Sequence, residues 1–343
     1  MLATSIKWGN SPVTLHSGSI DDIRRHIPSF ERRPFALSDA NNQHFRENLR
    51  LDTVVRLPHE DDAGCVPVGV VSKDYVLLPH TQVLDLAVQA LEKATIDPAD
   101  VRAELRISEL GERMALAFVL PAVYQFDPGD GHPMEARLEC LNSVDGSTRF
   151  RVEMGWFRLV CSNGLGFHIT RSEADRRHVG NLQSTHISAV LNNGLRDYQL
   201  ERDDVGRWVK TAVGLEAIGS WADGELRRHW GFKAAARAFH IARHGHDARI
   251  LAPFKGRTPT NAVVQQSRSV PGSRGEAANL FDVSQILAWL AKERRDVQEQ
   301  VERRAQIPAL MADLELRARS AVSPATTLAS GVTASQRQPR QPT

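Results

Sequence analysis

The stretch ARLECLNSVDGSTRFRVEMGWFRLVC, residues 136–161, decides the fold class. In its first half Ala136, Leu138 and Cys140 alternate with charged residues, as in a strand that buries one face. A second alternating run follows Asp145-Gly146. This dipeptide between two such runs is a strong hairpin signal, because both turn positions tolerate positive φ. The stretch therefore predicts two antiparallel strands joined at residues 145–146.

The second of these strands ends with an arginine in an unusual place. The apolar face of an uninterrupted strand would consist of Phe150, Val152, Met154 and Trp156. Arg158 falls on that same face, where a buried guanidinium needs partners. Candidate partners are Glu104, Glu139 and Glu153. The alternative is a β-bulge at Gly155 that turns Arg158 to the other face.

The residues after Arg158 do not indicate a reactive site. Cys161 could act as a nucleophile with a base nearby, but no histidine spacing establishes one, so we expect a buried structural thiol. Asn163-Gly164 is typical of a turn, and the segment lacks the third glycine of a dinucleotide-binding loop. Phosphate-loop and nucleophile-elbow motifs are absent from the sequence. We predict no catalytic residue and no cofactor.

The surrounding sequence extends the sheet. Residues 101–107 alternate, and RMALAFVLP (113–121) follows Gly111, which predicts another hairpin. TVVRL (53–57) and GVVSKDYVLL (69–78) favour strands, and Thr81 is expected to cap a helix. We therefore predict an α+β protein with a twisted, mostly antiparallel sheet at about 53–170. Residues 1–50, interrupted by prolines, are expected to be a loosely structured entry segment.

The C-terminal half, 171–318, favours helices that cover the sheet, with a polar loop at 255–279. Asp282 and Gln285 resemble a capping box that opens a helix running to about Gln306, where Pro308 ends or kinks it. The apolar stripe of this helix is Val283, Leu287, Leu290, Val297 and Val301. It predicts packing within the chain, with a homo-oligomer through 282–306 as the alternative. Residues 319–343 are expected to be a disordered tail.

Composition narrows the class of protein. The chain has 343 residues, and no apolar run approaches the roughly 18 residues that a membrane span requires. The N-terminus lacks the pattern of a secretory signal, so we expect a cytoplasmic protein without a membrane partner. Three widely spaced cysteines favour neither a disulfide framework nor a structural zinc site.

A set of residues in the predicted hairpin resembles a known family. The set is Asn142, Asp145 and Gly146, followed by Arg158, Cys161, Asn163 and Gly164. In this order it resembles the phage/plasmid-like protein family, catalogued as domain of unknown function 932. DYVLLPH (74–80) and NLFDVSQILAWL (279–290) are similar to other segments of that family, so the likeness spans about 50–305. It implies a mobile-element context and a structural motif of unknown role, without an established chemistry.

A basic segment lies at residues 227–257. It holds eight lysines or arginines and one acid, Asp247, and so carries a net charge of +7 in a chain whose total is +2. On a helix Phe232 and Phe239 share an apolar stripe, with Lys233 and Arg237 on its flank. Such a segment is either a solvated flank that docks on the sheet, a nucleic-acid contact, or a contact for a membrane or acidic protein.

The leading hypothesis is a non-enzymatic protein of a phage, plasmid or integrated element that binds nucleic acid, namely single-stranded DNA. The expected binding residues are Arg227, Arg228, Trp230, Lys233, Arg237, Arg243, Phe254, Lys255 and Arg257. The cations would contact phosphates, and Trp230 or Phe254 would stack on bases. A flat sheet with one solvated face would also suit nucleic acid.

Three other readings remain open at this point. The first is an element-encoded modulator that engages a host protein and has no nucleic-acid activity. The second is an enzyme with Cys161 as nucleophile, which has the weakest support. The third is a metal site at His240, His244 and His246. The glutamate of a metalloprotease motif is missing there and arginines lie nearby, so we expect no metal.

Overall fold

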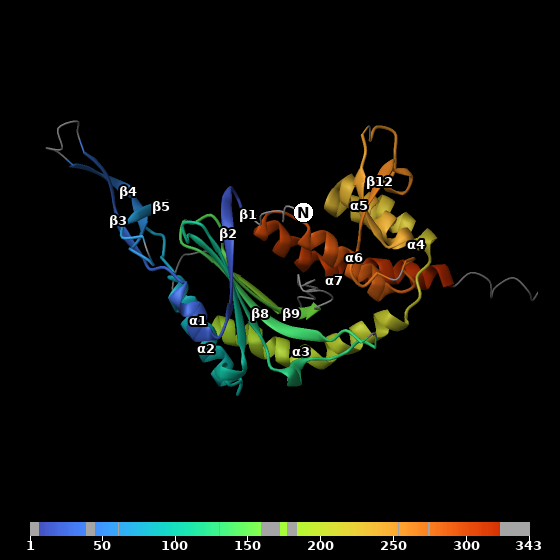
Figure 1. The fold of residues 1–343 in the computed structure, drawn as a ribbon, viewed down its shortest axis with the longest axis horizontal. Helices are drawn as coiled ribbons and strands as arrows, with labels where there is room; N and C mark the ends of the chain where they lie inside the picture. Colours follow the sequence, from blue (N-terminus) through green and yellow to red (C-terminus); the bar gives the residue numbers. More distant parts are fainter. Residues whose placement is uncertain are drawn as a thin grey trace, which may run out of the picture.

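The computed structural model describes residues 7–38, 45–60, 62–129, 131–158, 172–176, 184–252, 254–273 and 275–322. Its central element is an antiparallel seven-stranded sheet in the order β1-β2-β6-β7-β8-β9-β10. The strands are β1 (Lys7–Trp8), β2 (Ser11–Gly18), β6 (Arg102–Ser108), β7 (Arg113–Val119), β8 (Met134–Ser143), β9 (Phe150–Arg158) and β10 (Ser172–Arg176). Figure 1 shows that the sheet is strongly curved. The predicted α+β class is confirmed.

Both predicted hairpins of this sheet are confirmed. Strands β6 and β7 pair in antiparallel fashion, as do β8 and β9. The β8–β9 register runs without a shift from Met134 opposite Arg158 to Leu141 opposite Arg151. In the turn Gly146 has a φ of 73°, a conformation that glycine adopts without strain. Because the register does not shift at Gly155, the bulge considered there is absent from this described pair, and the Arg158 side chain stays on the apolar face.

Helices cover the apolar face of the sheet. Helices α1 (Ile20–Arg25), α2 (His80–Lys93) and α3 (Ser184–Lys210) lie along one side of the sheet in Figure 1. Leu116 and Leu138 of the sheet share one buried cluster with Leu84 and Leu91 of α2. Pro79 occupies the N-cap of α2 and Thr81 lies inside the first turn, so the predicted cap at Thr81 is wrong. The short 3₁₀ turns of this region are η1 (Pro98–Asp100) and η2 (Ala122–Tyr124).

The other face of the sheet carries charged residues and is covered by helix α7 (Val297–Val322), which lies across the sheet from α3 in Figure 1. The buried carboxylate of Glu139 on β8 binds two guanidinium groups, that of Arg106 on β6 at 2.5 Å and that of Arg304 on α7 at 2.6 Å. A small apolar cluster beside these ion pairs comprises Trp8, Ala115, Leu141, Val297 and Val301. A flat sheet with a solvated face was therefore a wrong expectation for its central strands.

The N-terminal region is ordered rather than loosely structured. Strand β2 pairs with β6 and so belongs to the main sheet. Strands β3 (Phe30–Ser38), β4 (Phe45–Arg56) and β5 (Val66–Ser72) form a separate three-stranded sheet, here called the arm, which projects from the body in Figure 1. The strand predicted at 69–78 ends at Ser72. The entry segment expected at 1–50 was therefore wrong for its described residues.

The C-terminal region is mainly helical, as predicted, but includes a hairpin. Its elements are α4 (Leu215–Trp221), the π-helical turn η3 (Ala222–Leu226), α5 (Arg227–His244), β11 (His246–Ile250), the 3₁₀ turn η4 (Pro259–Asn261), β12 (Val264–Ser269), α6 (Leu280–Lys292) and α7. Strand β12 pairs with β11, so the loop predicted at 255–279 contains a strand. Its exposed, polar sequence gave no alternation of apolar residues from which this strand could be predicted.

The single helix predicted at 282–306 is two helices. Asn279 is the N-cap of α6, and Asp282 completes the capping box, so the box lies three residues earlier than predicted. Helix α7 begins at Val297 and continues past Pro308. Ile307 and Met311 on either side of this proline are fully buried, and their packing offsets the backbone hydrogen bond that proline removes.

The apolar stripe of the predicted helix lies inside the chain. Val283, Leu287, Leu290, Val297 and Val301 are all buried by other parts of the chain. They are therefore not exposed for the homo-oligomer contact considered for 282–306. Of the predicted tail, residues 319–322 belong to α7, and the rest lies outside the described residues.

We predict that Glu139→Ala lowers the free energy of unfolding by about 3–5 kcal/mol, because it leaves the guanidinium groups of Arg106 and Arg304 buried without their shared carboxylate. Urea denaturation followed by circular dichroism measures this. Glu302→Ala, at an exposed position of α7, should change the value by less than about 0.5 kcal/mol. Equal effects of the two changes would contradict the role assigned to Glu139.

Candidate nucleic-acid interface

The motif residue Asn142 has a structural role. Its buried Nδ2 group donates to the carbonyl oxygen of Leu78 at 2.9 Å and lies 2.8 Å from Nδ1 of His80. Nε2 of His80 lies 2.9 Å from the carbonyl oxygen of Gly111. These contacts fit a neutral His80 that donates from Nε2 and accepts at Nδ1. Asn142 thus fixes the segment 74–80 against the end of β8.

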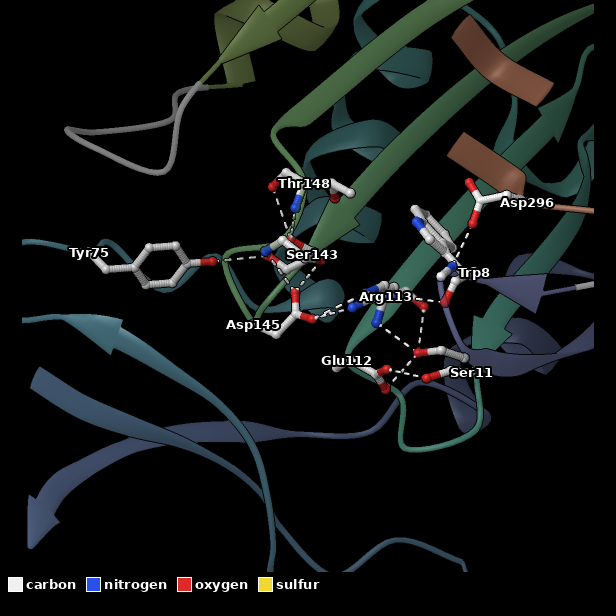
Figure 2. A network of polar contacts seen from close by, with 12 residues as sticks. Trp8, Ser11, Tyr75, Glu112, Arg113, Ser143, Asp145, Thr148 and Asp296 are labelled. Carbon is white, nitrogen blue, oxygen red and sulfur yellow. Dashed lines mark hydrogen bonds and ion pairs between the residues drawn. The ribbon is translucent and has the colours of Figure 1, made fainter. Parts of the chain in front are cut away.

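Asp145 holds the β8–β9 turn in a polar network that Figure 2 shows from close by. Its Oδ2 atom accepts from Nε and Nη2 of Arg113 at 3.1 and 3.0 Å, and Nη1 of Arg113 donates to the carbonyl oxygen of Trp8 at 2.7 Å. The Tyr75 hydroxyl donates to the carbonyl oxygen of Ser143 at 3.0 Å, and burial raises the pKa of this tyrosine. The network joins the turn to β1 and to the base of the arm. It is an assembly of structural contacts.

Arg158 lies at the end of β9 on the apolar face and is 2% exposed. Its guanidinium carbon is 5.3 Å from the ring centroid of Phe281 on α6. The carboxylates considered as its partners, those of Glu104, Glu139 and Glu153, bind Arg137, Arg106 and Arg151 instead. They lie on the other face of the sheet, so they are not partners of Arg158. The remaining motif residues, Cys161, Asn163 and Gly164, lie outside the described residues.

A buried carboxylate, that of Asp247, links the elements that carry the basic segment. Asp247 at the start of β11 accepts from Nε of Arg237 on α5 at 2.8 Å and from Nε1 of Trp289 on α6 at 2.9 Å. The backbone N–H of Ala248 donates to it at 2.7 Å. Burial acts to raise the pKa of Asp247, but the hydrogen bonds and charge of Arg237, with the other two donors, bring it below its usual value. Asp247 thereby ties α5, β11 and α6 together.

Two aromatic rings and two cations of the basic segment lie close together. The rings of Phe232 and Phe254 are 5.4 Å apart, between centroids, and both side chains are half-buried. The Lys233 ammonium lies 5.3 Å from the ring centroid of Phe254, and the Arg227 guanidinium lies 5.7 Å from that of Phe232. We call these four residues the cation–aromatic cluster. Figure 1 places α5 and the β11–β12 hairpin at the end of the molecule away from the arm.

Gly231 interrupts α5 between Arg227 and Phe232. It has a φ of 81° and a ψ of 168° inside α5, so the helix is kinked there. Phe232, the next residue, contacts Phe254 in the loop that follows β11. The glycine in the sequence indicated an interruption, but the contact between the two rings depends on the fold of that loop.

Several cations of the segment 227–257 lack an acidic partner among the described residues. They are Arg227, Lys233, Arg243, Arg249 and Lys255, all of which are exposed. Arg257 is also exposed, and its Nη1 donates to the carbonyl oxygen of Asn261 at 3.1 Å. Their charge is therefore available for an external anion. Arg249 was not among the predicted binding residues.

Two of the predicted binding residues, Trp230 and Arg237, are engaged inside the protein. Trp230 is 6% exposed and its Nε1 donates to Oε1 of Gln306 at 2.8 Å, so it is not free to stack on bases. Arg237 is held by Asp247. Arg228 forms an ion pair with Glu225 at 2.6 Å, but its side chain is 70% exposed. Helical spacing gives the direction of a side chain and not the groups that fold against it.

Two histidines, His240 and His244, lie side by side on α5. The rings of His240 and His244 lie 4.7 Å apart, and burial lowers the pKa of His240, with the charge of His244 adding to the effect. Within the described ranges, no group of three or more His, Cys, Asp or Glu side chains is placed to hold a metal ion. Likewise, none of the described helices combines the length and apolar character of a membrane span.

Comparison with known families identifies one segment. Residues 67–224 match the model of a family described as Domain of unknown function (DUF932). The match covers α2, the strands β6 to β10, α3 and α4, and it ends before the cation–aromatic cluster. No curated protein and no solved structure matches the chain.

We predict that Asp247→Asn lowers the free energy of unfolding at pH 7 by about 3 kcal/mol, because it removes the charge that pairs with the partly buried Arg237. Since folding lowers the pKa of Asp247, its stabilising contribution is present above the ordinary carboxyl value of 3.8 and is lost as the pH falls below it.

The difference between the wild type and the variant should therefore narrow between pH 5 and pH 3, as measured by urea denaturation at each pH. Asp203→Asn, at an exposed position of α3, is the matched control and should show little effect. A difference that stays constant down to pH 3 would argue against this ion pair as the source of stability.

Proposed function

We propose that this protein is a non-enzymatic nucleic-acid-binding protein of a phage, plasmid or integrated element, and that it binds single-stranded DNA. The observation that carries the proposal is the cation–aromatic cluster with the exposed Lys255 beside it. Cations next to half-buried rings suit a single strand, since phosphates pair with the charges and bases stack on the rings. The mobile-element context rests on the resemblance of the β8–β9 motif to the phage/plasmid-like family.

The position of the cations favours this location over the sheet. The central strands of the sheet are covered by α7, where Glu139 binds Arg304. Around the cluster, in contrast, Lys233 and Lys255 are exposed and have no ion-pair partner among the described residues. An approaching phosphate backbone therefore meets uncompensated charge there, and release of its counterions favours binding.

We expect the affinity for a fluorescent single-stranded oligonucleotide to fall with salt at a log–log slope of about −3, which corresponds to about four phosphate contacts. Lys233→Gln with Lys255→Gln should reduce the slope to about −1.5, and Phe254→Ala should weaken binding by about 1–3 kcal/mol without changing the slope. Fluorescence anisotropy across a salt series measures both quantities.

The matched control is Lys7→Gln with Lys93→Gln, which removes two charges from exposed positions on β1 and α2. It should leave the affinity and the slope unchanged. Absence of binding by the wild type at low salt would refute the proposal, and an equal loss in the control would show that the cluster is not the site.

A second function, binding of a host protein as a modulator, is favoured by one observation on the arm. Leu37 and Leu49 are 71% and 86% exposed on β3 and β4, and the arm projects from the body in Figure 1. Exposed leucines on a projecting hairpin suit contact with another protein.

We expect the wild type to bind a partner protein from nuclease-treated lysate. Leu37→Ser with Leu49→Ser should abolish this binding and leave oligonucleotide binding unchanged. Affinity purification with quantitative mass spectrometry checks this. A partner that disappears on nuclease treatment of the wild type would count against a protein contact.

A further inference from the structure

Two histidine rings are stacked where the arm meets the body. His16 lies on β2 of the main sheet, and His26 is the C-cap of α1. Their ring centroids are 3.9 Å apart, and the ring planes differ by 20°. A stack of this kind tolerates one imidazolium ion, whereas two at this distance repel each other. The contact therefore requires at least one of the rings to be neutral.

The arm adds a carboxylate to the ring pair. Glu60 lies in the β4–β5 connection, of which residues 57–60 and 62–65 are described. Its Oε1 atom is 3.0 Å from Nδ1 of His26 and 3.7 Å from Nε2 of His59. The φ of Glu60 is 50°, a left-handed conformation that is uncommon for a residue other than glycine and persists only where surrounding contacts hold it. The contact with His26 is one of these, and it attaches the β4–β5 connection to α1.

The sheet presents an apolar side chain to the ring pair. Leu105 on β6 is paired with His16, so the two side chains lie on the same face, and Leu105 is fully buried. Glu104 and Arg106, on either side of it, point to the charged face, where both form ion pairs. The charges of these two residues therefore do not face the rings.

Helix α1 carries four charged side chains before its C-cap. Arg24 binds Asp85 of α2 at 2.7 Å, and Arg25 binds Asp22 at 2.9 Å. The fourth, Asp21, is exposed at the start of the helix. The acid in hydrogen-bond contact with the ring pair is Glu60 of the arm.

The surroundings oppose protonation of His16. Burial lowers the pKa of His16, and the charge of His26 adds to this effect, against an opposing effect of Glu60. The hydrogen bond with His26 lowers the pKa of Glu60, so its carboxylate is ionised throughout the range in which histidine titrates. One proton on the pair is therefore accommodated next to Glu60, whereas a second proton is taken up more readily when the rings are apart. Opening of the stack is favoured as the pH falls below 6.5, the ordinary histidine value, and the closed stack is favoured above it.

We propose that His16, His26 and Glu60 form a pH-sensitive latch between the body and the arm. Near neutral pH the rings stack, and Glu60 holds the β4–β5 connection against α1. In mildly acidic solution a second proton separates the rings and releases this connection. The apolar cluster around Val54 keeps the strands of the arm attached, so the release is local. The latch is separate from the cation–aromatic cluster and does not depend on either proposed function.

Hydrogen–deuterium exchange of the full chain, read by mass spectrometry at about pH 7.5 and about pH 5.5, tests the latch. After correction for the intrinsic pH dependence of exchange, peptides of the β4–β5 connection should lose about threefold to tenfold of their protection at the lower pH, the range that corresponds to a pKa change of about one unit in one group. Peptides of β8 should keep their protection. His16→Phe retains a ring that stacks but cannot be protonated, so this loss should disappear.

Glu60→Gln is a second test at an exposed position, and it should enlarge the loss at the lower pH because the anion that favours the first proton is gone. The control His132→Phe replaces an exposed histidine in the loop before β8 and should show the same loss as the wild type. Equal protection of the wild-type connection at both pH values would overturn the proposal. So would a loss shared by the β8 peptides, a loss that persists in His16→Phe, or one that Glu60→Gln leaves unchanged.

Discussion

The unbroken register between β8 and β9 determines on which side of the sheet each charged residue lies. Because side chains alternate along a strand, a slip of one residue would exchange the two faces of β9. With the observed pairing, Glu153 lies on the face covered by α7, whereas Arg158 lies on the apolar face beside Trp156. The turn that sets this register is held by the contact of Asp145 with Arg113. The motif in the turn therefore positions residues more than ten positions away.

The charged face of the sheet is occupied by α7 at its central strands. Glu139 is shared by Arg106 and Arg304, so α7 is attached to the sheet by buried ion pairs rather than by apolar packing alone. Such pairs lose much of their gain to desolvation, but removal of one member leaves a buried charge, which makes the arrangement specific. The contact holds α7 over the central strands. The two surfaces to which binding is assigned under the proposed functions, on the arm and at the β11–β12 end, lie away from this contact.

The parts of the fold that could be predicted are those in which local pattern and tertiary contact agree. The hairpins β6–β7 and β8–β9 have alternating residues and a turn signal, and both formed as expected. The strands before residue 50 could not be predicted in this way, because prolines interrupt their pattern. Pro12 stands where β2 pairs with the two-residue strand β1, and Pro34 adjoins an irregularity in the β3–β4 pairing. Proline is tolerated at such positions because its missing N–H is not needed.

The site was harder to predict, since it depends on contacts between distant residues. Arg237 was expected to contact phosphates and Trp230 to stack on bases, but Asp247 and Gln306 engage them in the fold. Phe254 could be named as a stacking residue from composition. Its partner Phe232 could not, because their contact joins a helix residue to a loop more than twenty residues away.

The family-matched segment ends at residue 224. The cation–aromatic cluster begins at Arg227, so no property of that family can be transferred to it, and its function has to rest on its own charge and geometry.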